Sequence, residues 1–436
     1  MRRSSMMLAA VAAMLFPVHR AEATDVATQP NAAGQPSDES IAATSPRDAA
    51  RRAEWIAQPR TPPKELVGFF RPAKRYRGCL GEYRSPLLFD DGRQVETAAD
   101  WQRRRREILQ TWHAAMGPWP ALVDAPRVET IQTTRRGRVM QHRLRLGIAL
   151  GDEMVNAFLL VPDGDGPFPA VVVVYYDAQT GVGRGTPLRD FAWQLARHGF
   201  VTLSLGKPNS GVNLETPTSI PARSHPYLGP HGRPVTVQPL SALAYAAANA
   251  HAFLARRPDV LADRIGIVGH SFGGKWALMA ACLHDKFACG AWSDPGIVFD
   301  ERDRRKDNPS GSVNYWDEWY LGAAPGTIVE GGRAYRFRKP PSEGEPRTGA
   351  YRQLIEGRHD LVELHALMAP RPFLVSGGTA DRPERWTALN HAIAVNRLLG
   401  FSNRVAMANR PTHEPTEASN DEIYRFFEWW LLERED

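Results

Sequence analysis

The chain has 436 residues, of which 43% are hydrophobic and 23% are charged. These ordinary globular values exclude a fully disordered, collagen-like or coiled-coil chain. Lysine and arginine total 54 against 48 acidic residues, a net charge of +6 that is mild for this length. The arginine clusters at 103–106 and 135–138 lack interleaved aromatic residues, so we expect no nucleic-acid partner. No apolar run long enough for a membrane helix follows the N-terminus.

The first 23 residues have the pattern of an export signal. Arg2 and Arg3 precede an apolar run from Met6 to Val18, and an A-x-A cleavage site ends at Ala23. We therefore predict that residues 1–23 are a signal peptide and that the protein is periplasmic or extracellular. We expect no contact with the membrane once the signal is removed.

Two segments precede the regular part of the chain. Residues 24–62 are rich in Ala, Thr, Ser, Pro and Asp, a composition that predicts a disordered linker. Residues 63–127 are predicted to form an N-terminal helical extension, with its helix between residues 97 and 116. Apolar side chains recur there at helical spacing: Trp101, Ile108, Leu109, Trp112 and Met116.

From about residue 128 the pattern changes to strands that alternate with helices. Segments 139–149 and 153–161 predict an antiparallel pair of strands. The β-branched and aromatic run at 170–176 is typical of a strand buried on both faces of a parallel sheet. Further strands are expected at 200–205, 265–269, 289–293, 373–377 and 404–408, and helices at 191–198, 238–256, 273–284, 384–399 and 420–432.

This alternation predicts an α/β fold over residues 128–436, with a mostly parallel central sheet, helices on both faces and antiparallel strands at its start. Residues 295–368 interrupt the alternation with proline, glycine and charge. We interpret them as an insertion after the sixth strand, of the kind that often forms a lid or binds substrate. We find no internal repeat.

The segment Gly269-His270-Ser271-Phe272-Gly273 matches the pattern G-x-S-x-G. A predicted strand runs into it and a predicted helix runs out, which is the context of a nucleophile elbow. The flanking glycines are needed because the serine sits on a sharp, strained turn. Ser271 is therefore the candidate nucleophile, and the backbone N–H of Phe272 a candidate oxyanion donor. The second donor is expected from the loop at Asp177, after the strand 170–176.

A nucleophilic serine needs a base and an acid that orients it. His413 follows the last predicted strand and is the candidate base. Asp381, after the strand 373–377, is the favoured acid because of its usual chain placement. Asp294, just past the strand 289–293, is the alternative acid. No cysteine or histidine spacing predicts a metal site, and we expect no cofactor.

These residues resemble the α/β-hydrolase superfamily, near its dienelactone-hydrolase-like and carbohydrate-esterase branches. The elbow, Ala369-Pro370-Arg371-Pro372 and His413 carry the resemblance, over about residues 95–435. The elbow continues to Lys275 and then resembles the G-x-S-R-x-G-K motif of glucuronoyl esterases, in which the lysine helps to bind the uronic sugar. Phe272 stands where those enzymes have an arginine that helps their oxyanion.

The resemblance also bears on the acid and on the substrate. Glucuronoyl esterases can take their acid after the sixth strand, where Asp294 lies, whereas acetyl xylan esterases fit Asp381. Lys275 is thus a candidate substrate-binding residue. Trp316 and Trp319, in an aromatic group within the insertion, are further candidates because aromatic rings can stack on sugar faces.

We therefore predict a secreted serine ester hydrolase acting on a carbohydrate-linked ester, acetyl or uronoyl, of a small molecule or a polysaccharide. Two alternatives remain: a prolyl-oligopeptidase-like serine peptidase, and a catalytically silent hydrolase scaffold that binds sugar or a partner. The sequence leaves open the acyl group, the alcohol, the role of the insertion and the oligomeric state. It also leaves open whether Cys79, Cys282 and Cys289 form a disulfide.

Overall fold

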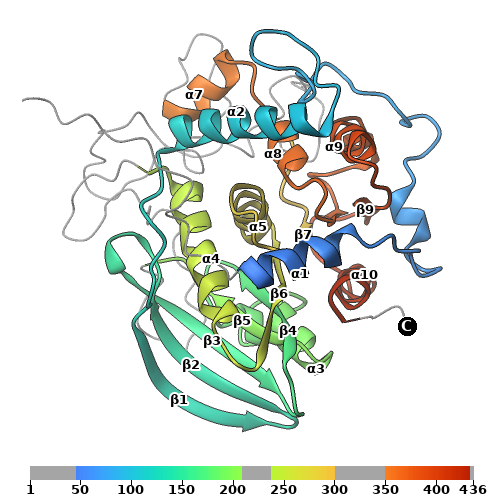
Figure 1. Cartoon of the computed structure of the whole chain (residues 1–436). Helices are drawn as coiled ribbons and strands as arrows, with labels where there is room; N and C mark the ends of the chain where they lie inside the picture. The colour runs from blue at the N-terminus through green and yellow to red at the C-terminus, as the bar shows by residue number, and fades with distance from the viewer. Residues whose placement is uncertain (1–45, 209–236, 300–348, 433–436) are drawn as a thin grey trace, which may run out of the picture. The chain divides into compact units, whose positions relative to one another are not determined.

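The computed structural model describes residues 46–208, 237–299 and 349–432 (Figure 1). Nine strands within these ranges form one sheet in the order β1-β2-β3-β5-β4-β6-β7-β8-β9. The strands are β1 Val128–Arg136, β2 Val139–Gly147, β3 Met154–Pro162, β4 Phe168–Val174, β5 Val201–Leu205, β6 Val260–His270, β7 Cys289–Ser293, β8 Phe373–Gly377 and β9 Val405–Asn409.

Helices connect and cover these strands. The α-helices are α1 Pro46–Ala57, α2 Ala98–Met116, α3 Phe191–Arg197, α4 Pro239–Ala255, α5 Phe272–Leu283, α7 Gly349–Glu356, α8 Leu361–Leu367, α9 Trp386–Leu398 and α10 Glu417–Phe427. Short 3₁₀ turns are η1 Val67–Phe70, η2 Leu150–Asp152, η3 Thr180–Val182 and η6 Pro383–Arg385, and α10 continues into the π-helical η7 Glu428–Leu432. In the described ranges, no helix has the length and apolar character needed to cross a membrane.

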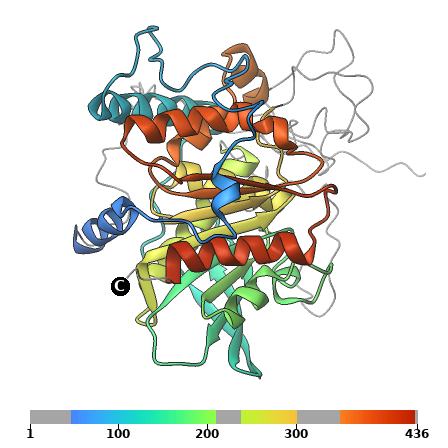
Figure 2. The same cartoon turned by 90° about the vertical axis from the view of Figure 1, so that its right-hand side faces the viewer.

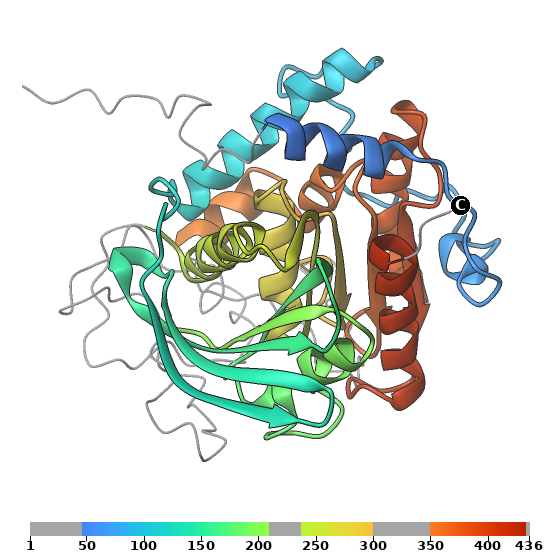
Figure 3. The same ribbon diagram turned by 60° about the horizontal axis from the view of Figure 1, so that its bottom comes forward.

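The sheet has an antiparallel part and a parallel part. Strands β1, β2, β3 and β5 pair antiparallel, and every neighbouring pair from β5 to β9 is parallel. Figure 3 shows β1, β2 and β3 as long strands along one edge of the sheet. The predicted α/β class, with antiparallel strands before a mostly parallel sheet, is therefore confirmed.

The central strands divide their side chains between two cores. Along β4, Val172 and Val174 join a core with residues of α2, α4, α5, α8 and α9, while Val171 and Val173 join a core with α3, α10 and η7. Figure 2 shows α2 and α9 on one side of the sheet and α10 on the other. This burial on both faces explains the continuous β-branched run of β4.

Two elements were missed in the sequence. The strand β1 has no apolar alternation, because it is a largely exposed edge strand with Ile131 at an irregularity in its pairing and 47% exposed. Helix α1 lies within residues 24–62, which were predicted to be a disordered linker, so that prediction is wrong for residues 46–57. Trp55 explains the difference: its Nε1 donates to the carbonyl of Trp430 at 2.9 Å, and the guanidinium of Arg264 lies 3.6 Å from its ring.

The predicted insertion at 295–368 ends earlier in the structure than the sequence suggested, because α8 belongs to the core. Residues 300–348 lie outside the described ranges, but α8 at Leu361–Leu367 is buried along its whole length and packs against the sheet. Asp360 caps this helix by accepting a hydrogen bond from the backbone N–H of Leu361 at 2.6 Å. The segment 361–368 therefore belongs to the core of the fold, as the helical layer before β8.

A buried ion pair joins the N-terminal extension to α8. The guanidinium of Arg104, on α2, lies 3.1 Å from the carboxylate of Glu363, and both side chains are 1% exposed. Glu363 also accepts a hydrogen bond from Trp112 Nε1 at 3.3 Å. Arg104 has two further carboxylate contacts nearer the surface, with Asp90 at 2.6 Å and with Glu107 at 2.9 Å. The extension is thus fastened to the hydrolase core through buried charge as well as apolar packing.

Removing the carboxylate of Glu363 tests this connection. In Glu363→Gln, Arg104 loses its buried partner, and a buried charge that loses a partner is costly. We expect the free energy of unfolding, measured with urea, to fall by about 2 kcal/mol. The matched control is Glu107→Gln, because Glu107 contacts the same guanidinium but is 34% exposed. We expect its loss to stay below about 1 kcal/mol, and equal losses would contradict the importance of burial.

Candidate active site

The strand β6 ends at His270 and helix α5 begins at Phe272, so Ser271 alone forms the turn between them. Its backbone has φ 54° and ψ −113°, a strained conformation for a residue with a side chain. A Cβ added to Gly269 would lie 2.2 Å from the carbonyl oxygen of Gly273, and one added to Gly273 would lie 2.1 Å from that of Val174. Both flanking glycines are therefore required, and the turn has the geometry of a nucleophile elbow.

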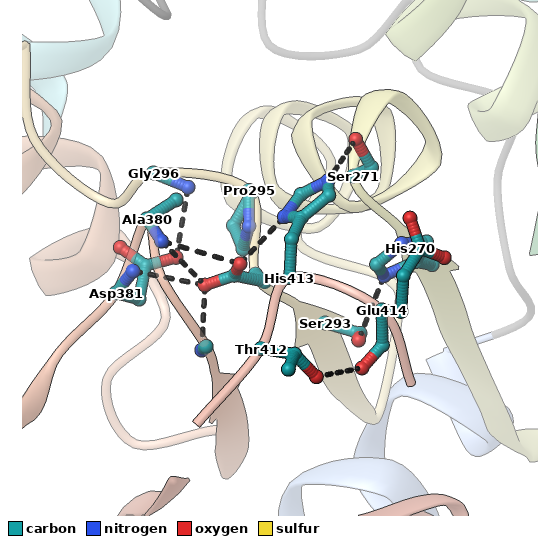
Figure 4. Close-up of polar contacts among 12 residues, drawn as sticks. His270, Ser271, Ser293, Pro295, Gly296, Ala380, Asp381, Thr412, His413 and Glu414 are labelled. Carbon is teal, nitrogen blue, oxygen red and sulfur yellow. Dashed lines mark hydrogen bonds and ion pairs between the residues drawn. The ribbon is translucent and has the colours of Figure 1, made fainter. Parts of the chain in front are cut away.

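His413 lies in the loop between β9 and α10, and its imidazole faces Ser271 (Figure 4). Its Nε2 is 2.9 Å from Ser271 Oγ, and its Nδ1 is 2.6 Å from Asp294 Oδ2. The His413 side chain is 31% exposed, whereas that of Asp294 is fully buried. The three side chains form a continuous hydrogen-bonded series from a buried carboxylate to a hydroxyl, the arrangement that activates a serine.

The structure brings the alternative acid, Asp294, to His413, and it does not bring the favoured Asp381 there. The backbone N–H groups of Gly378 and Asp381 donate to Asp294 Oδ1, at 2.6 and 2.9 Å. The Asp381 carboxylate turns toward the loop after β7 and accepts from the N–H groups of Gly296 and Ile297, at 2.8 and 2.7 Å. Chain placement misled here because both aspartates follow parallel strands at the same edge of the sheet, and the backbone of each loop decides which carboxylate reaches the imidazole.

Burial governs the charges around this series. Burial, with the nearby Asp294 carboxylate, raises the pKa of Asp381 to about 7. His270 is buried and the pKa of its imidazole lies well below the usual value, chiefly because of burial and then because His413 is close. Within the described part of the chain, no group of three or more His, Cys, Asp and Glu side chains could hold a metal ion.

Two neighbours of this hydrogen-bonded series were not predicted from the sequence. His270 places its ring centroid 4.9 Å from that of His413, and its Nδ1 is 3.0 Å from Ser293 Oγ. Arg410 donates to the carbonyls of His413 and Glu414, at 2.6 and 2.8 Å. It also donates to Ser293 Oγ at 3.1 Å, which joins the histidine loop to the end of β7. His270 occupies a variable position of the G-x-S-x-G segment, and Arg410 lies three residues before His413, so neither position carries a signal of its own.

The predicted oxyanion residues lie on adjoining elements. Phe272 opens α5, and its ring stacks on that of Tyr176, with centroids 4.3 Å apart and planes 9° apart. Asp177 follows Tyr176, and its carboxylate accepts from the N–H of Thr180 at 2.8 Å, which shapes the loop after β4. The backbone of this loop therefore runs beside the start of α5, and the oxyanion role of both residues stays a prediction.

Of the three predicted substrate-binding residues, the structure describes only Lys275. Lys275 is fully buried, and its Nζ donates to the carbonyl of Pro295, the residue that follows Asp294. In this structure the ammonium group therefore supports the loop of the acid and is covered from solvent. Trp316 and Trp319 lie outside the described residues.

The sheet order, the elbow and the histidine loop define an α/β-hydrolase fold. No protein-family model matches the chain, and no curated protein matches its sequence. The chain is similar to the solved structure of a glucuronoyl esterase from Solibacter usitatus, with 16% identity over 80% of this chain and 97% of that one, at a TM-score of 0.60. A CE15 glucuronoyl esterase from Caldicellulosiruptor kristjansonii has 22% identity over 83% and 93% of the two chains, at a TM-score of 0.54.

A third solved structure, from Bacteroides fragilis NCTC 9343, is described as a putative acetyl xylan esterase. It has 14% identity over 86% of this chain and 87% of that chain, at a TM-score of 0.50. The names of these proteins describe glucuronoyl and acetyl xylan esterases, and at such identities the likeness establishes only that this chain shares their fold.

The elbow geometry predicts a sharp response to one methyl group. In Gly269→Ala the new Cβ would meet backbone, which cannot move aside as a flexible side chain can. We expect the free energy of unfolding, measured by chemical denaturation, to fall by about 3 kcal/mol. The control is Gly68→Ala, since a Cβ there would meet nothing within 4 Å. A Gly269→Ala variant as stable as its control would mean that the turn is not held in this conformation.

Proposed function

We propose that the protein is a serine carboxylic ester hydrolase that cleaves a carbohydrate-linked ester, with an acetyl or a uronoyl acid part. The observation that carries the proposal is the hydrogen-bonded series Asp294–His413–Ser271 at a strained elbow. A buried carboxylate on Nδ1 fixes the tautomer of the imidazole, so that Nε2 can accept the proton of Ser271. This arrangement argues against the alternative of a catalytically inactive binding protein, because binding alone does not require a strained serine that faces a histidine.

The chemistry follows from these three side chains. Ser271 Oγ attacks the ester carbonyl carbon while His413 Nε2 takes the hydroxyl proton, giving a tetrahedral oxyanion. The oxyanion collapses, the bond to the alcohol breaks, and Nε2 returns the proton to the departing alcohol. Water then attacks the acyl-enzyme with His413 again as base, which releases the acid and restores Ser271. No cofactor takes part in this sequence.

Backbone groups complete the proposed site. The oxyanion lies against the N–H of Phe272, at the positive end of α5, and against the loop that contains Asp177. Support comes from the contact of that loop with α5 through the stacked rings of Tyr176 and Phe272. The aromatic pair takes the place of the arginine in the glucuronoyl esterase motif, so the oxyanion depends here on backbone donors.

The substrate class rests on similarity. Similar structures include proteins named glucuronoyl esterases and one described as an acetyl xylan esterase. The resemblance implies that glucuronoyl esterases can take their acid after the sixth predicted strand, which is β7 in the structure. The contact between Asp294 and His413 favours that branch. Lys275, Trp316 and Trp319 remain predicted substrate residues. Together with the predicted signal peptide, this supports a secreted enzyme acting on a carbohydrate-linked ester of a small molecule or a polysaccharide.

The test compares wild type with Ser271→Ala on two substrates, acetylated xylan and a methyl ester of glucuronic acid. We expect wild type to cleave at least one of the two and the variant to lose at least ~10³-fold in kcat, because the nucleophile is gone. Acetate release and loss of the methyl ester are measured directly. Cleavage of the glucuronate ester alone would assign the uronoyl branch, and release of acetate alone would assign a deacetylase.

Three outcomes of the same experiment would contradict the proposal. Equal activity of wild type and Ser271→Ala would exclude the serine mechanism. Inactivity of wild type on both esters would remove the proposed substrate class, and labelling by a fluorophosphonate probe would then report separately whether Ser271 is a working nucleophile. A peptide substrate cleaved in place of both esters would favour the peptidase alternative.

A further inference from the structure

Two buried carboxylates at the edge of the sheet hold each other's loops. Asp294, after β7, accepts from the backbone N–H groups of the loop after β8, and Asp381, in that second loop, accepts from the backbone N–H groups that follow Asp294. Both side chains are fully buried. The Asp381 carboxylate is hydrogen-bonded beside Gly296 (Figure 4), whereas the Asp294 carboxylate contacts His413.

The space around the pair is closely filled. A Cβ added to Gly378 would lie 2.7 Å from Asp294 Oδ2 and 2.2 Å from the carbonyl of Thr412, the residue before the base. Asn409 Nδ2 donates to the Asp381 carbonyl at 2.8 Å, which joins the loop after β8 to the end of β9. The acid loop, the Asp381 loop and the histidine loop are therefore packed closely against one another.

We propose that Asp381 is a positioning residue, whose carboxylate fixes the backbone after Asp294 and so aims the Asp294 carboxylate at His413. The proposal rests on the proposed ester hydrolase, and it gives a task to the carboxylate that does not touch the imidazole. The Asp294 backbone has φ 50°, in the left-handed region that is uncommon for residues with a side chain. Two N–H groups within the next three residues are held by Asp381.

The charge on Asp381 makes this positioning sensitive to pH. Asp294 faces it from the loop after β7, Arg385 from η6, and Arg410 from the loop after β9. Lys275 of α5 supports the intervening Pro295 carbonyl. Burial and the neighbouring carboxylate raise the pKa of Asp381 to about 7, against the two N–H donors, which favour the ionised form. As pH falls through this value, Asp381 gains a proton and becomes a poorer acceptor for Gly296 and Ile297.

The test is Asp381→Asn, which keeps the shape but presents an NH₂ group to one of the two N–H donors. At about pH 8.5 we expect kcat for the ester to fall about tenfold with KM within about twofold, because a small displacement of the acid loop weakens catalysis more than binding. The variant resembles protonated Asp381 at every pH. The ratio of wild-type to variant kcat should therefore shrink toward one by about pH 5.5.

The matched control is Asp360→Asn. Asp360 is also a buried aspartate whose carboxylate accepts from a backbone N–H of the same segment, that of Phe299, at 3.3 Å. It lies outside the pair, so we expect some loss of thermal stability with kcat within about twofold at both pH values. If Asp381→Asn keeps full kcat at about pH 8.5, or if its deficit is the same at both pH values, the positioning role is overturned.

Asp294→Asn separates a failure of this inference from a failure of the proposed function. If the proposed triad is right, Asp294→Asn loses far more kcat than Asp381→Asn, on the order of 10³-fold or more. The reverse order would make Asp381 the acid and overturn both. Hydrogen exchange of residues 294–297, followed by mass spectrometry, reads the geometry without any substrate and leaves out Phe299, whose N–H donates to Asp360. Faster exchange there in Asp381→Asn than in Asp360→Asn is expected even if neither ester is cleaved, and unchanged exchange would overturn the inference.

Discussion

Everything at the candidate site depends on the direction in which one buried carboxylate points. Asp294 is fully buried, and a buried polar group is stable only when hydrogen bonds replace its hydration. The loop after β8 supplies backbone N–H groups, and His413 supplies the remaining contact. A backbone donor cannot rotate away as a side chain can, so the carboxylate keeps its direction. The Asp294 carboxylate thus holds the imidazole of His413 at Nδ1, while Nε2 faces Ser271.

The parallel part of the sheet makes this convergence possible. Strands β6, β7, β8 and β9 are neighbours and run the same way, so their carboxyl ends share one edge. Ser271, Asp294, Asp381 and His413 each follow one of these ends. Arg410 then joins neighbouring loops through the carbonyl of His413 and the hydroxyl of Ser293. The site is therefore carried on rigid strands and fixed by contacts between loops, which suits a reaction that needs atoms aligned in advance.

The sequence was sufficient to predict features that depend on residues close together in the chain, such as the turn at Ser271. Ser271 was recognisable because a glycine on each side of a serine, between a strand and a helix, reflects a steric need that acts within five residues. His413 was placed by chain order, and the structure brings it to the serine. Local sequence could not decide which of Asp294 and Asp381 contacts His413, because both residues follow parallel strands at the same edge of the sheet. That choice depends on where the N–H groups of two distant loops point.

Other misses have the same origin in long-range contact. Helix α1 looked like part of a linker because its sequence is polar, and its order comes from Trp55 meeting Trp430 far along the chain. Strand β1 is exposed at the sheet edge, so it lacks the apolar alternation that identifies buried strands. In each case the segment is ordered by a partner that no window of neighbouring residues contains.

Lys275 stands at the lysine position of the glucuronoyl esterase motif, but in this structure its side chain contacts the protein backbone at Pro295. It stands one helical turn after Ser271, and its backbone N–H donates to the serine carbonyl at 3.0 Å, as the first turn of α5 requires. That turn faces the loop after β7, so the buried ammonium meets the Pro295 carbonyl beside Asp294. Lys275 therefore belongs to the same support as Asp381: both act on the backbone that follows Asp294, and through it on the direction of the acid.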